Sequence, residues 1–546
     1  MSDLFLDRET REKIEWDRFL ACIEVCSPLG LYYKNRLKPF FAGQEKRLRE
    51  ELRRSCKFAD FISKNPRWVS DFASNIQEAK DLRLSFKRAR EGMVLSVTEL
   101  FEIKRLLLIL DNMKGLLKSK GFSSLAKFRP KGAPGLFRAL SKGNQSPQTF
   151  YLVDDYSPLL KRLRSEKFEL KLLMEKEKER LLEELKGLGI KHGRDGEVVV
   201  SKGTPDAFRF SADSRFYLKR ETLQTQVYAF RHSPRFLKWE SRVKEIEREE
   251  EKEERAICQK LSQKVSKFAD ALERDSEKVA YLDFLFAKSK VAIEYSGTLP
   301  QPASTNRKTA LTMVDGIHFP LSQRLKEKGL KFQPLSIQLK QGAALLTGAN
   351  MSGKTVLLKT IGLNICIAQH GMLVPAKSFR WRPLDFVFFS TRGKEQDGLS
   401  AFGMEIAGLK RALSVKEKKG LFLVDELARG TNPKEGFAIN AAILTYLSNS
   451  DSLSLFTSHF DGLAKACRAT HWQMAGLGNI SLDQVKLLAK GAGEDLMPKL
   501  MDYRLEKVKR EKAIPHDALK VALLLGLEEH VIELAETFLK KVQDEA

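Results

Sequence analysis

The segment Ala343-Ala-Leu-Leu-Thr347 is followed directly by Gly348-Ala-Asn-Met-Ser-Gly-Lys-Thr355, and the run Val356-Leu-Leu-Lys-Thr-Ile-Gly-Leu363 comes next. The first segment is typical of a short buried strand and the third of a helix. Between them the loop follows the pattern G-x-x-x-x-G-K-[ST] in the strand–loop–helix context that this pattern requires. The sequence therefore predicts a phosphate-binding loop; the alternative is an ordinary glycine turn.

The chemistry of phosphate binding explains the residue types in this loop. Glycines let backbone N–H groups close around phosphate oxygens, and the N-terminus of the following helix adds the positive end of its dipole. Lys354 would place its charge on the β- and γ-phosphates, and Thr355 would present a hydroxyl group to Mg²⁺. We expect the nucleotide-binding residues of this loop to be Gly348, Asn350, Met351, Ser352, Gly353, Lys354 and Thr355.

Polar residues follow two further predicted strands. Leu421-Phe-Leu-Val424 ends in Asp425-Glu426, and Leu453-Ser-Leu-Phe456 ends in Thr457-Ser-His459. Asp425 would hold the metal through water, and Glu426 would polarise the attacking water as a general base. His459, at the carboxyl end of a parallel strand, can reach a γ-phosphate or its attacking water. The alternatives are an ordinary strand end and a structural histidine.

The composition favours an anionic partner. The 546 residues include 95 Lys and Arg against 71 Asp and Glu, which gives a formal net charge of +24. Such a balance suits nucleic acid, nucleotide or an acidic protein surface without choosing among them. Six cysteines are no disulfide scaffold. Without an apolar run of ~18 residues or a secretory signal at the N-terminus, a reduced cytoplasmic protein with no membrane partner is expected.

The predicted secondary structure changes along the chain. Residues 1–165 read mostly as helices, interrupted by the basic, Gly- and Pro-bearing loop Phe128–Gly135. Long helices are predicted over 164–188 and from about Pro234 to 274, with strand-like runs at Glu197–Ser201 and Ala207–Phe210 between them. Charges that alternate over Val243–Arg255 favour a solvated helix face. The two helices would form an arm of ~35–60 Å. From about 310, short apolar runs alternate with helical periods, which indicates α/β architecture.

Four motifs in one order resemble those of the MutS family of ABC-type ATPases. Thr347–Thr355 is similar to T-G-P-N-M-x-G-K-[ST], Asp425–Thr431 to D-E-L-x-R-G-T, Phe456–His459 to F-x-[ST]-H, and Leu399–Glu405 to S-[ST]-F-x-x-E. The resemblance implies an enzyme that hydrolyses ATP with Mg²⁺, with Glu426 and His459 as catalytic residues and Thr355 and Asp425 as metal ligands.

The same resemblance implies a dimer. It places Ser400 against the γ-phosphate of the partner subunit, and Phe332 where the family stacks an aromatic side chain on the adenine. Two ATPase domains would therefore close around nucleotide. The partner would be a second copy of this chain or a MutS-like protein in a heterodimer.

The fold implied is multidomain: an all-α core and long lever helices with a small clamp module, then an α/β P-loop ABC-type ATPase domain. The expected boundaries are 1–163 for the helical core, 164–275 for the lever with a clamp module at about 189–230, 276–305 for the return to the core, and 306–546 for the ATPase domain. No Phe-x-Glu wedge occurs near the N-terminus. Mismatch-recognition and connector domains and a nuclease-like tail are expected to be absent.

DNA is the first cargo that this resemblance suggests, in a clamp related to mismatch repair but without mismatch reading. Basic residues of the clamp module would contact phosphates and give salt-sensitive, sequence-neutral binding. The candidates are Lys191, Arg194, Lys202, Arg209, Lys219 and Arg220, interleaved with Phe208, Phe210, Phe216 and Tyr217. The alternative is a solvated module whose aromatic side chains form its own core.

A second cargo stays open. The stretch Asp425–Pro433, the segment Pro515–Lys520 and the domain content also resemble MutS-like ATPases proposed as reactivating chaperones. Their clients are adenosylcobalamin-dependent lysine or ornithine aminomutases. In that case, ATP-driven opening and closing would eject a damaged cofactor from a client enzyme.

Overall fold

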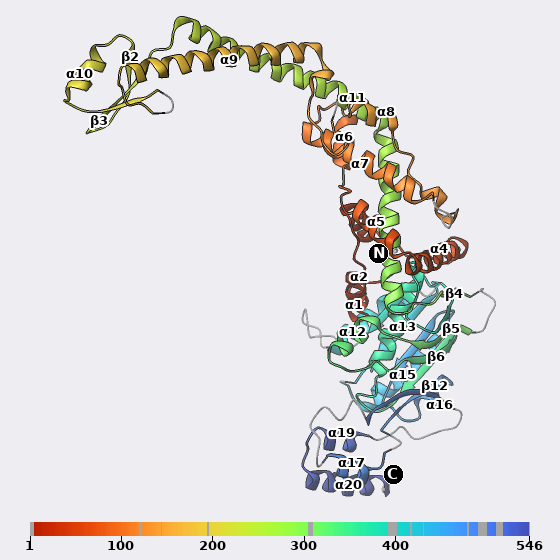
Figure 1. Ribbon diagram of the computed structural model, residues 1–546. Coiled ribbons are helices and arrows are strands. Elements are labelled where there is room, and N and C mark those ends of the chain that lie inside the picture. The colour runs from red at the N-terminus through yellow and green to blue at the C-terminus, as the bar shows by residue number, and fades with distance from the viewer. Residues whose placement is uncertain are drawn as a thin grey trace. The chain divides into compact units, whose positions relative to one another are not determined.

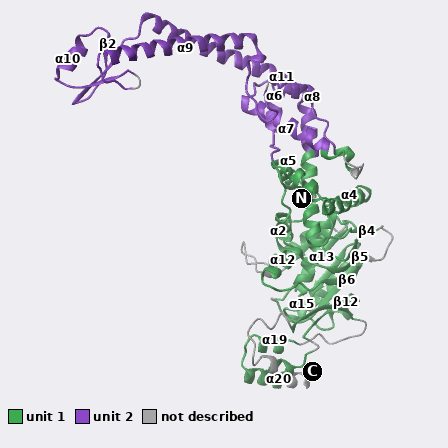
Figure 2. Ribbon diagram, in the orientation of Figure 1, with its two compact units in different colours: residues 1–77, 116–128, 279–546 green, residues 78–115, 129–278 purple. Residues whose placement is uncertain are grey.

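The structure is a computed structural model (Figure 1). It describes residues 5–118, 123–143, 145–193, 196–303, 309–390, 401–414, 418–429, 431–477, 480–489, 500–508 and 517–544. Two compact units divide the chain (Figure 2). Unit 1 comprises 1–77, 116–128 and 279–546, and unit 2 comprises 78–115 and 129–278. A mixed multidomain fold with a helical N-terminal part and α/β sheets towards the C-terminus is therefore confirmed.

Unit 1 contains two β-sheets. The six-stranded sheet has the order β13 (Asp502–Lys507), β12 (Thr470–Gly476), β7 (Gly342–Thr347), β11 (Leu453–Thr457), β10 (Gly420–Asp425) and β9 (Phe386–Ser390). The smaller sheet has the order β4 (Gln301–Pro302), β8 (Ser378–Trp381), β5 (Thr309–Gly316) and β6 (Leu335–Lys340). Neighbours from β12 to β9 in the larger sheet pair in parallel, and β13 is antiparallel to β12. The three strands predicted at 343–347, 421–424 and 453–456 are all present.

Helices cover both faces of the six-stranded sheet. Helix α13 (Lys354–Gln369) packs against β10 and β11 and also against β5, so it lies between the two sheets. Helices α14 (Ala401–Leu413) and α15 (Pro433–Ser448) pack against β9 and β7. Apolar residues of α13 such as Leu358, Ile361 and Ile365 are fully buried in the largest hydrophobic core of the protein.

Further helices of unit 1 are described by the structure. They are α1 (Arg8–Lys13), α2 (Trp16–Ala21), α3 (Pro28–Asn35), α4 (Glu45–Lys64), α5 (Pro66–Ile76), η1 (Ser123–Phe128), α12 (Phe319–Glu327), α16 (Leu463–Ala466), α17 (Leu482–Ala489), α19 (Ala518–Leu524) and α20 (Glu529–Asp544). Among the helices that the structure describes, none is both long and apolar enough to span a membrane.

Unit 2 is built around two long helices, α9 (Pro158–Gly187) and most of α11 (Pro234–Glu294). Its shorter helices are α6 (Arg83–Arg90), α7 (Val97–Leu116), α8 (Pro134–Ala139) and η2 (Asp154–Tyr156). Ion pairs join α9 to α11: the Arg164 guanidinium lies 2.8 Å from Glu250 and 2.7 Å from Glu254. The acidic residues of 243–255 therefore also bind the neighbouring helix, which a reading of that stretch as a purely solvated face had not anticipated.

The end of α11 was predicted too early. The helix does not stop near 274 but continues to Glu294, because residues 275–294 contain no Gly or Pro and bury side chains such as Leu282, Phe284 and Leu285. It ends where Ser296 takes a positive φ of 53° and Gly297 follows.

A small module closes unit 2 between the two long helices. Its sheet has the order β1 (Val198–Ser201), β3 (Thr225–Phe230) and β2 (Phe216–Glu221), all antiparallel. The strand expected at 207–210 is wrong: those residues lie in helix α10 (Pro205–Ala212). Thr204 caps that helix through its hydroxyl group, and Pro205 supplies a fixed φ at the first helical position.

A buried ion-pair cluster ties three parts of unit 1 together. The Lys288 ammonium group on α11 donates to the Glu51 carboxylate on α4 at 2.6 Å and to the Gly371 carbonyl beyond the end of α13 at 2.9 Å. The Tyr281 hydroxyl donates to Glu51 at 3.0 Å, and the Arg54 guanidinium contacts the same carboxylate. Burial lowers the pKa of Lys288, and the Glu51 carboxylate opposes that effect.

We expect Lys288→Met to destabilise the protein by about 3 kcal/mol, because it leaves a buried carboxylate and a buried carbonyl without their main donor. Urea unfolding followed by circular dichroism measures the loss. Lys290→Met is the matched control, since Lys290 is exposed on the same helix. Equal midpoints for the two variants would show that the cluster contributes nothing to stability.

Candidate functional site

The site lies where three parallel strands end. In the sheet register, Asp425 at the end of β10 pairs with Thr457 on β11, and Thr457 pairs with Leu346 on β7. The carboxyl ends of the strands therefore meet at one edge of the sheet, which is where open α/β sheets place their ligands. Residues that follow these strands converge there although they lie far apart in the sequence.

The loop between β7 and α13 depends on two glycines with positive φ. Gly348 has φ 148° and Gly353, the N-cap of α13, has φ 93°. A Cβ atom at Gly348 would lie 2.9 Å from Met474 Cβ and 3.0 Å from Ser352 Oγ. The loop is thus pressed against β12, and its backbone approaches the site as closely as a glycine permits.

Lys354 begins α13 with its ammonium group turned back into the loop. Its Nζ donates to the carbonyls of Gly348 at 2.7 Å and Ala349 at 3.0 Å, and lies 3.6 Å from a Glu426 oxygen. Its side chain is only 5% exposed. Burial lowers the pKa of Lys354, and Glu426 and Asp425 partly offset that effect. A buried cation held by neutral carbonyls is poised to bind an anion that enters the loop.

Asp425 joins the loop to the neighbouring strand. One carboxylate oxygen accepts a hydrogen bond from Thr355 Oγ1 at 2.6 Å, and the other accepts one from Thr457 Oγ1 at 2.7 Å. Thr457 Oγ1 also accepts from the Glu426 backbone N–H at 2.9 Å. The carboxylate is therefore fixed beside the Thr355 hydroxyl, and the following residue is fixed with it.

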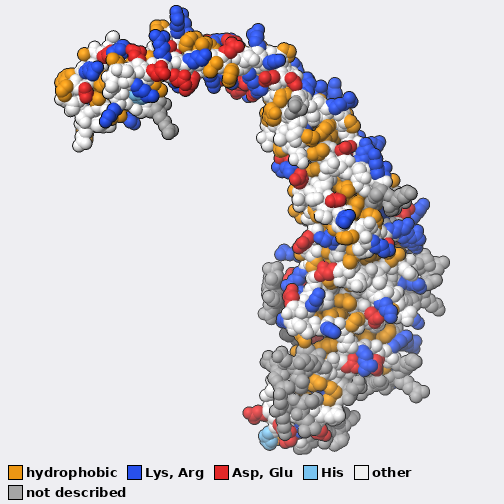
Figure 3. Space-filling model, viewed as in Figure 1, with side chains coloured by type: hydrophobic (Ala, Val, Ile, Leu, Met, Phe, Trp, Pro, Cys, Tyr) orange, Lys and Arg blue, Asp and Glu red, His pale blue; other side chains and the backbone are white. Residues whose placement is uncertain are grey.

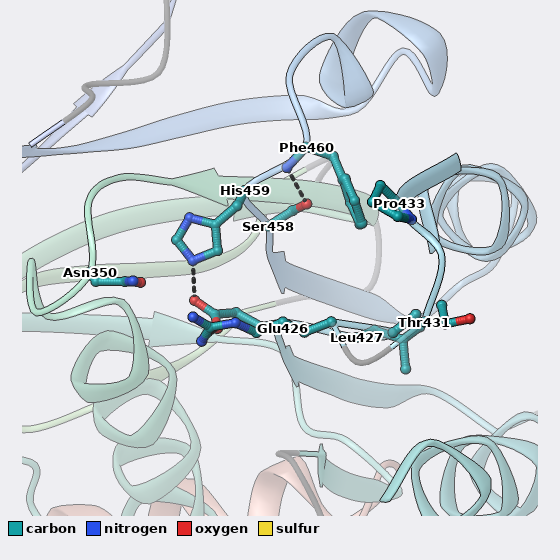
Figure 4. Close-up of a pocket in the computed structure, with 10 residues that line it drawn as sticks. Asn350, Glu426, Leu427, Thr431, Pro433, Ser458, His459 and Phe460 are labelled. Atoms are coloured by element: carbon teal, nitrogen blue, oxygen red, sulfur yellow. Dashed lines mark hydrogen bonds and ion pairs between the residues drawn. The ribbon is translucent and has the colours of Figure 1, made fainter. Parts of the chain in front are cut away.

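Glu426 faces a pocket of about 240 Å³ with three cationic or basic groups around it. Its carboxylate accepts from His459 Nε2 and, at 2.6 Å, from the Arg429 guanidinium (Figure 4). Burial by itself would raise the pKa of Glu426, but the His459 hydrogen bond and the charges of Lys354 and Arg429 lower it to about 2. Glu426 is consequently ionised at neutral pH. Its backbone has φ 56°, a conformation that is uncommon for a non-glycine residue.

The pocket opens between the loop and the strand ends. In Figure 4 the Asn350 side chain and the His459 ring extend towards Glu426 from different loops. Its lining consists of Asn350, Glu426, Leu427, Ala428, Arg429, Thr431, Pro433, Ser458, His459 and Phe460. A cavity with a carboxylate, an imidazole and a guanidinium beside a glycine loop can bind an anionic substrate and move a proton at it.

The donor set also fits a divalent cation. A threonine hydroxyl and a carboxylate oxygen lie 2.6 Å apart, and Mg²⁺ commonly uses one or two such protein oxygens together with waters and substrate phosphates. In the described part of the chain, no cluster of three or more His, Cys, Asp or Glu side chains is arranged to hold a metal alone. The loop itself carries an orphaned polar atom, because Ser352 Oγ is buried without a hydrogen-bond partner among the described residues.

The structure brings together most of the residues predicted for the site. Lys354, Thr355, Asp425, Glu426 and His459 are linked by the contacts above, and Gly348, Asn350, Met351, Ser352 and Gly353 form the loop around them. Phe332 is half-buried against the core cluster that also contains Tyr503, whose ring approaches Gly353. Ser400 and Arg194 lie outside the described residues.

Two partners in the site were not predicted. Thr457 bridges Asp425 and Glu426, and Arg429 binds the Glu426 carboxylate. The pairing of neighbouring parallel strands would have pointed to Thr457, because it stands level with Asp425. The role of Arg429 could not be predicted in this way, because it depends on the geometry of the turn after β10, where Glu426 and Ala428 both have positive φ.

The basic residues of the small module fall into two groups. Lys202 pairs with Glu221 at 2.8 Å and Lys219 pairs with Glu197 at 2.5 Å. Lys191, Arg209 and Arg220 are exposed and have no ion pair within the described residues. The aromatic side chains divide as well: Phe210 and Phe216 form the core of the module, whereas Phe208 is 69% and Tyr217 40% exposed.

Comparison with known proteins places this architecture in a class. The family model "MutS domain V" matches residues 344–543, which include the glycine loop and every strand that ends at the site. The chain is similar to proteins named Endonuclease MutS2. It is 26% identical over 521 residues to the one from Caldanaerobacter subterraneus subsp. tengcongensis, a match that covers 91% of this chain and 61% of that protein.

Other relatives agree. The Endonuclease MutS2 of Aquifex aeolicus is 25% identical over 97% of this chain and 67% of its own length. That of Halothermothrix orenii is 30% identical over 54% of this chain and 35% of its own length. Together these matches support membership of the MutS family. It spans about 61% of the Caldanaerobacter relative and about a third of the Halothermothrix relative.

The glycine at the start of the loop provides a test of the local geometry. We expect Gly348→Ala to destabilise unit 1 by about 2 kcal/mol, from its backbone conformation and the close contacts with Met474 and Ser352. Gly462→Ala is the control: its φ is 73°, but a Cβ atom there meets nothing within 4 Å, so only the backbone cost of about 1 kcal/mol applies. Differential scanning calorimetry compares the two, and equal losses would contradict the packing of the loop on β12.

Proposed function

We propose that this chain is a Mg²⁺-dependent ATPase of the MutS type that couples ATP binding and hydrolysis to a DNA-binding clamp. The observation that carries the proposal is the convergence of Lys354, Thr355, Asp425, Glu426 and His459 at one edge of a parallel sheet. Each side chain has the chemistry that its position in phosphoryl transfer requires.

The loop would bind the triphosphate of ATP. The backbone N–H groups at the start of α13 and the Lys354 ammonium group would neutralise the phosphate oxygens. Lys354 would exchange its two carbonyl acceptors, Gly348 and Ala349, for phosphate oxygens. Phe332 would stack on the adenine, as the family resemblance implies; it is half-buried, and the side chain of the next residue, Gln333, accepts a hydrogen bond from the Tyr503 backbone N–H.

Thr355 and Asp425 would hold Mg²⁺, which supplies electrostatic stabilisation of the charge that develops on the transferred phosphoryl group. Glu426 would orient and polarise the attacking water. His459 would hold the Glu426 carboxylate in place or contact the γ-phosphate itself. Ionised Glu426 suits this task, because a carboxylate that is already deprotonated can accept a hydrogen bond from water at neutral pH.

A second subunit would complete the site. The pocket at Glu426 is open to solvent on one side, as its exposed neighbours Asn350 and Arg429 indicate. In the family that the motifs resemble, the serine corresponding to Ser400 reaches the nucleotide of the partner. ATP would then stabilise a closed pair, either two copies of this chain or a MutS-like heterodimer, and hydrolysis would release it.

DNA is the cargo that the relatives favour. Proteins named endonucleases act on nucleic acid, and several of them match this chain over most of its length. The exposed cations Arg209 and Arg220 and the exposed Phe208 ring of the small module provide phosphate and stacking contacts. We propose no mismatch reading. No relative reported above favours the aminomutase client.

We expect Lys354→Ala to abolish ATP binding and Glu426→Gln to bind ATP but hydrolyse it at least about 100-fold more slowly. Isothermal titration with ATP and Mg²⁺ measures binding, and phosphate release measures turnover. Sedimentation of Glu426→Gln with ATP should show a trapped dimer.

Lys359→Ala is the control for this experiment, because Lys359 lies about one and a half turns further along α13 and only approaches Glu15 at 3.9 Å. Unchanged ATP affinity in Lys354→Ala would refute the phosphate-binding loop. A Glu426→Gln protein that stays monomeric with saturating ATP would refute the shared site.

For the module, we expect the double variant Arg209→Ala, Arg220→Ala to reduce the slope of log K against log salt for duplex DNA by about 2. Fluorescence anisotropy between 50 and 200 mM salt gives the slope. Lys202→Ala, Lys219→Ala removes the same charge from residues that are already paired with carboxylates. If the two double variants behave alike, the unpaired arginines are not the phosphate contacts.

A further inference from the structure

Two acid-free segments stand out in the sequence of this basic protein. Residues 112–153 contain eight Lys and Arg and no Asp or Glu, and they include the basic loop Phe128–Gly135. Residues 256–269 of α11 contain three Lys and no acid, although the preceding stretch 245–255 has seven Glu. Nothing in the ATP site or the small module uses either segment.

Unit 2 brings the part of the first segment from residue 129 onwards into contact with α11. The Asp275 carboxylate on α11 accepts from the backbone N–H groups of Lys131 and Gly132, both at 2.8 Å. A Cβ atom at Gly135 on α8 would lie 3.9 Å from the Phe268 ring on α11. Helix α8 therefore lies beside the acid-free part of α11, and the basic loop lies about two turns further along the same helix, at Asp275.

The lysines of that length share one face. At 100° per residue, Lys260, Lys264 and Lys267 fall within about 60° of arc and rise over about 10 Å of helix. All three are exposed, as are Lys131 on the loop and Arg138 on α8. We call Lys131, Arg138, Lys260, Lys264 and Lys267 the basic strip. Figure 3 shows Lys and Arg side chains gathered on the surface where α8 and α11 run side by side.

The strip differs from Arg164 and Arg242, two cations of the long helices that are paired. Arg164 and Arg242 each reach carboxylates of the neighbouring helix, whereas no residue of the strip has an ion pair within the part of the chain that the structure describes. Like charges at i,i+4 and i,i+3 spacing repel and weaken a helix. The fold gains nothing from that repulsion, which points to a ligand that supplies the opposite charge.

We propose that the basic strip binds the phosphodiester backbone of a double-stranded nucleic acid, at a place separate from the small module. Phosphates follow one another at 3.4 Å of axial rise per strand, so the 10 Å row of lysines matches about three consecutive phosphates. The strip has no aromatic side chain, and no acidic residue stands between its lysines on α11. It therefore reads charge and spacing and no base sequence. The inference extends the proposed function, since it concerns a second contact with the same class of cargo.

The test replaces Lys131, Lys260, Lys264 and Lys267 together by Gln in the full chain. Binding to a 30-base-pair duplex is measured by fluorescence anisotropy between 50 and 200 mM salt. Because each phosphate contact contributes a slope of about 0.9, we expect the slope of log K against log salt to fall by about 2–4 and affinity at 100 mM salt to fall at least about tenfold. The basal ATPase rate should not change.

The matched control removes four exposed cations from the acid-rich part of the same helix: Lys238, Arg248, Lys252 and Arg255, each to Gln. It lowers the net charge equally but leaves the strip intact. Equal losses in the two quadruple variants would overturn the strip and assign the effect to net charge. Failure of the ATP-binding experiment on Lys354 would instead overturn the ATPase proposal and leave this result untouched.

The probe separates the sources of the phosphodiester backbone. Duplex DNA and duplex RNA of the same sequence are compared, together with poly-glutamate of equal charge. A strip-dependent loss with either duplex supports the proposal and identifies the nucleic acid. A strip-dependent loss that is equally large with poly-glutamate overturns it, because the strip would then bind any polyanion, and so does a wild-type chain that binds neither duplex at 50 mM salt.

Discussion

The Glu51–Lys288 ion pair is the constraint on which the arrangement of unit 1 depends. It is buried, and it joins α4, the final turns of α11 and the backbone just beyond α13 through a single carboxylate and a single ammonium group. The partners cannot separate without leaving a charge unpaired in a low-dielectric interior, so the three elements are held in one relative position. Helix α13 begins at Lys354 in the glycine loop and ends beside this pair. Helix α13 thus runs from the candidate site to the ion pair that fixes the last turns of α11.

The features that the sequence predicted correctly depend on the residue types within a strand or loop and on the ends of parallel strands. The strands at 343–347, 421–424 and 453–456 are apolar because they are buried on both faces. The glycine loop was predictable from the G-x-x-x-x-G-K-[ST] spacing between a predicted strand and a predicted helix. The convergence of Asp425, Glu426 and His459 was predictable because parallel strands end at one edge. The errors have equally local causes. The alternation around Phe208 and Phe210 suggests a strand, but Thr204 and Pro205 begin a helix there. Helix α11 continues past residue 274 because its last turns are stabilised by burial in the fold, which the pattern of charges does not reveal.

The sequence alone did not predict which charged side chains form ion pairs, and these pairs determine which charges remain available to a ligand. The acid-rich stretch of α11 reads as a solvated face, yet Glu250 and Glu254 bind Arg164 across the helix pair. In the sequence, the basic residues proposed for DNA contact in the clamp module look equivalent. In the structure, Lys202 pairs with Glu221 and Lys219 with Glu197. Arg209 and Arg220 form no ion pair within the described residues. The formal net charge of +24 for the whole chain therefore does not indicate how much positive charge a particular surface presents to a ligand. The cations that remain available to a ligand are the ones that the fold leaves unpaired.

The same principle explains how the candidate site could respond to nucleotide. Without a ligand, the charges of the site satisfy one another: Lys354 donates to loop carbonyls, and Glu426 is held by His459 and Arg429. A triphosphate competes for Lys354 and Arg429 with far more negative charge than Glu426 carries, so its binding would exchange these contacts for contacts to phosphate. Glu426 would then lose part of its cationic surroundings, and the pKa of its carboxylate would rise from about 2 towards its ordinary value. Phosphate binding would thus make Glu426 a stronger base at the position where water must be activated, which links occupancy of the loop to the chemistry without a large rearrangement.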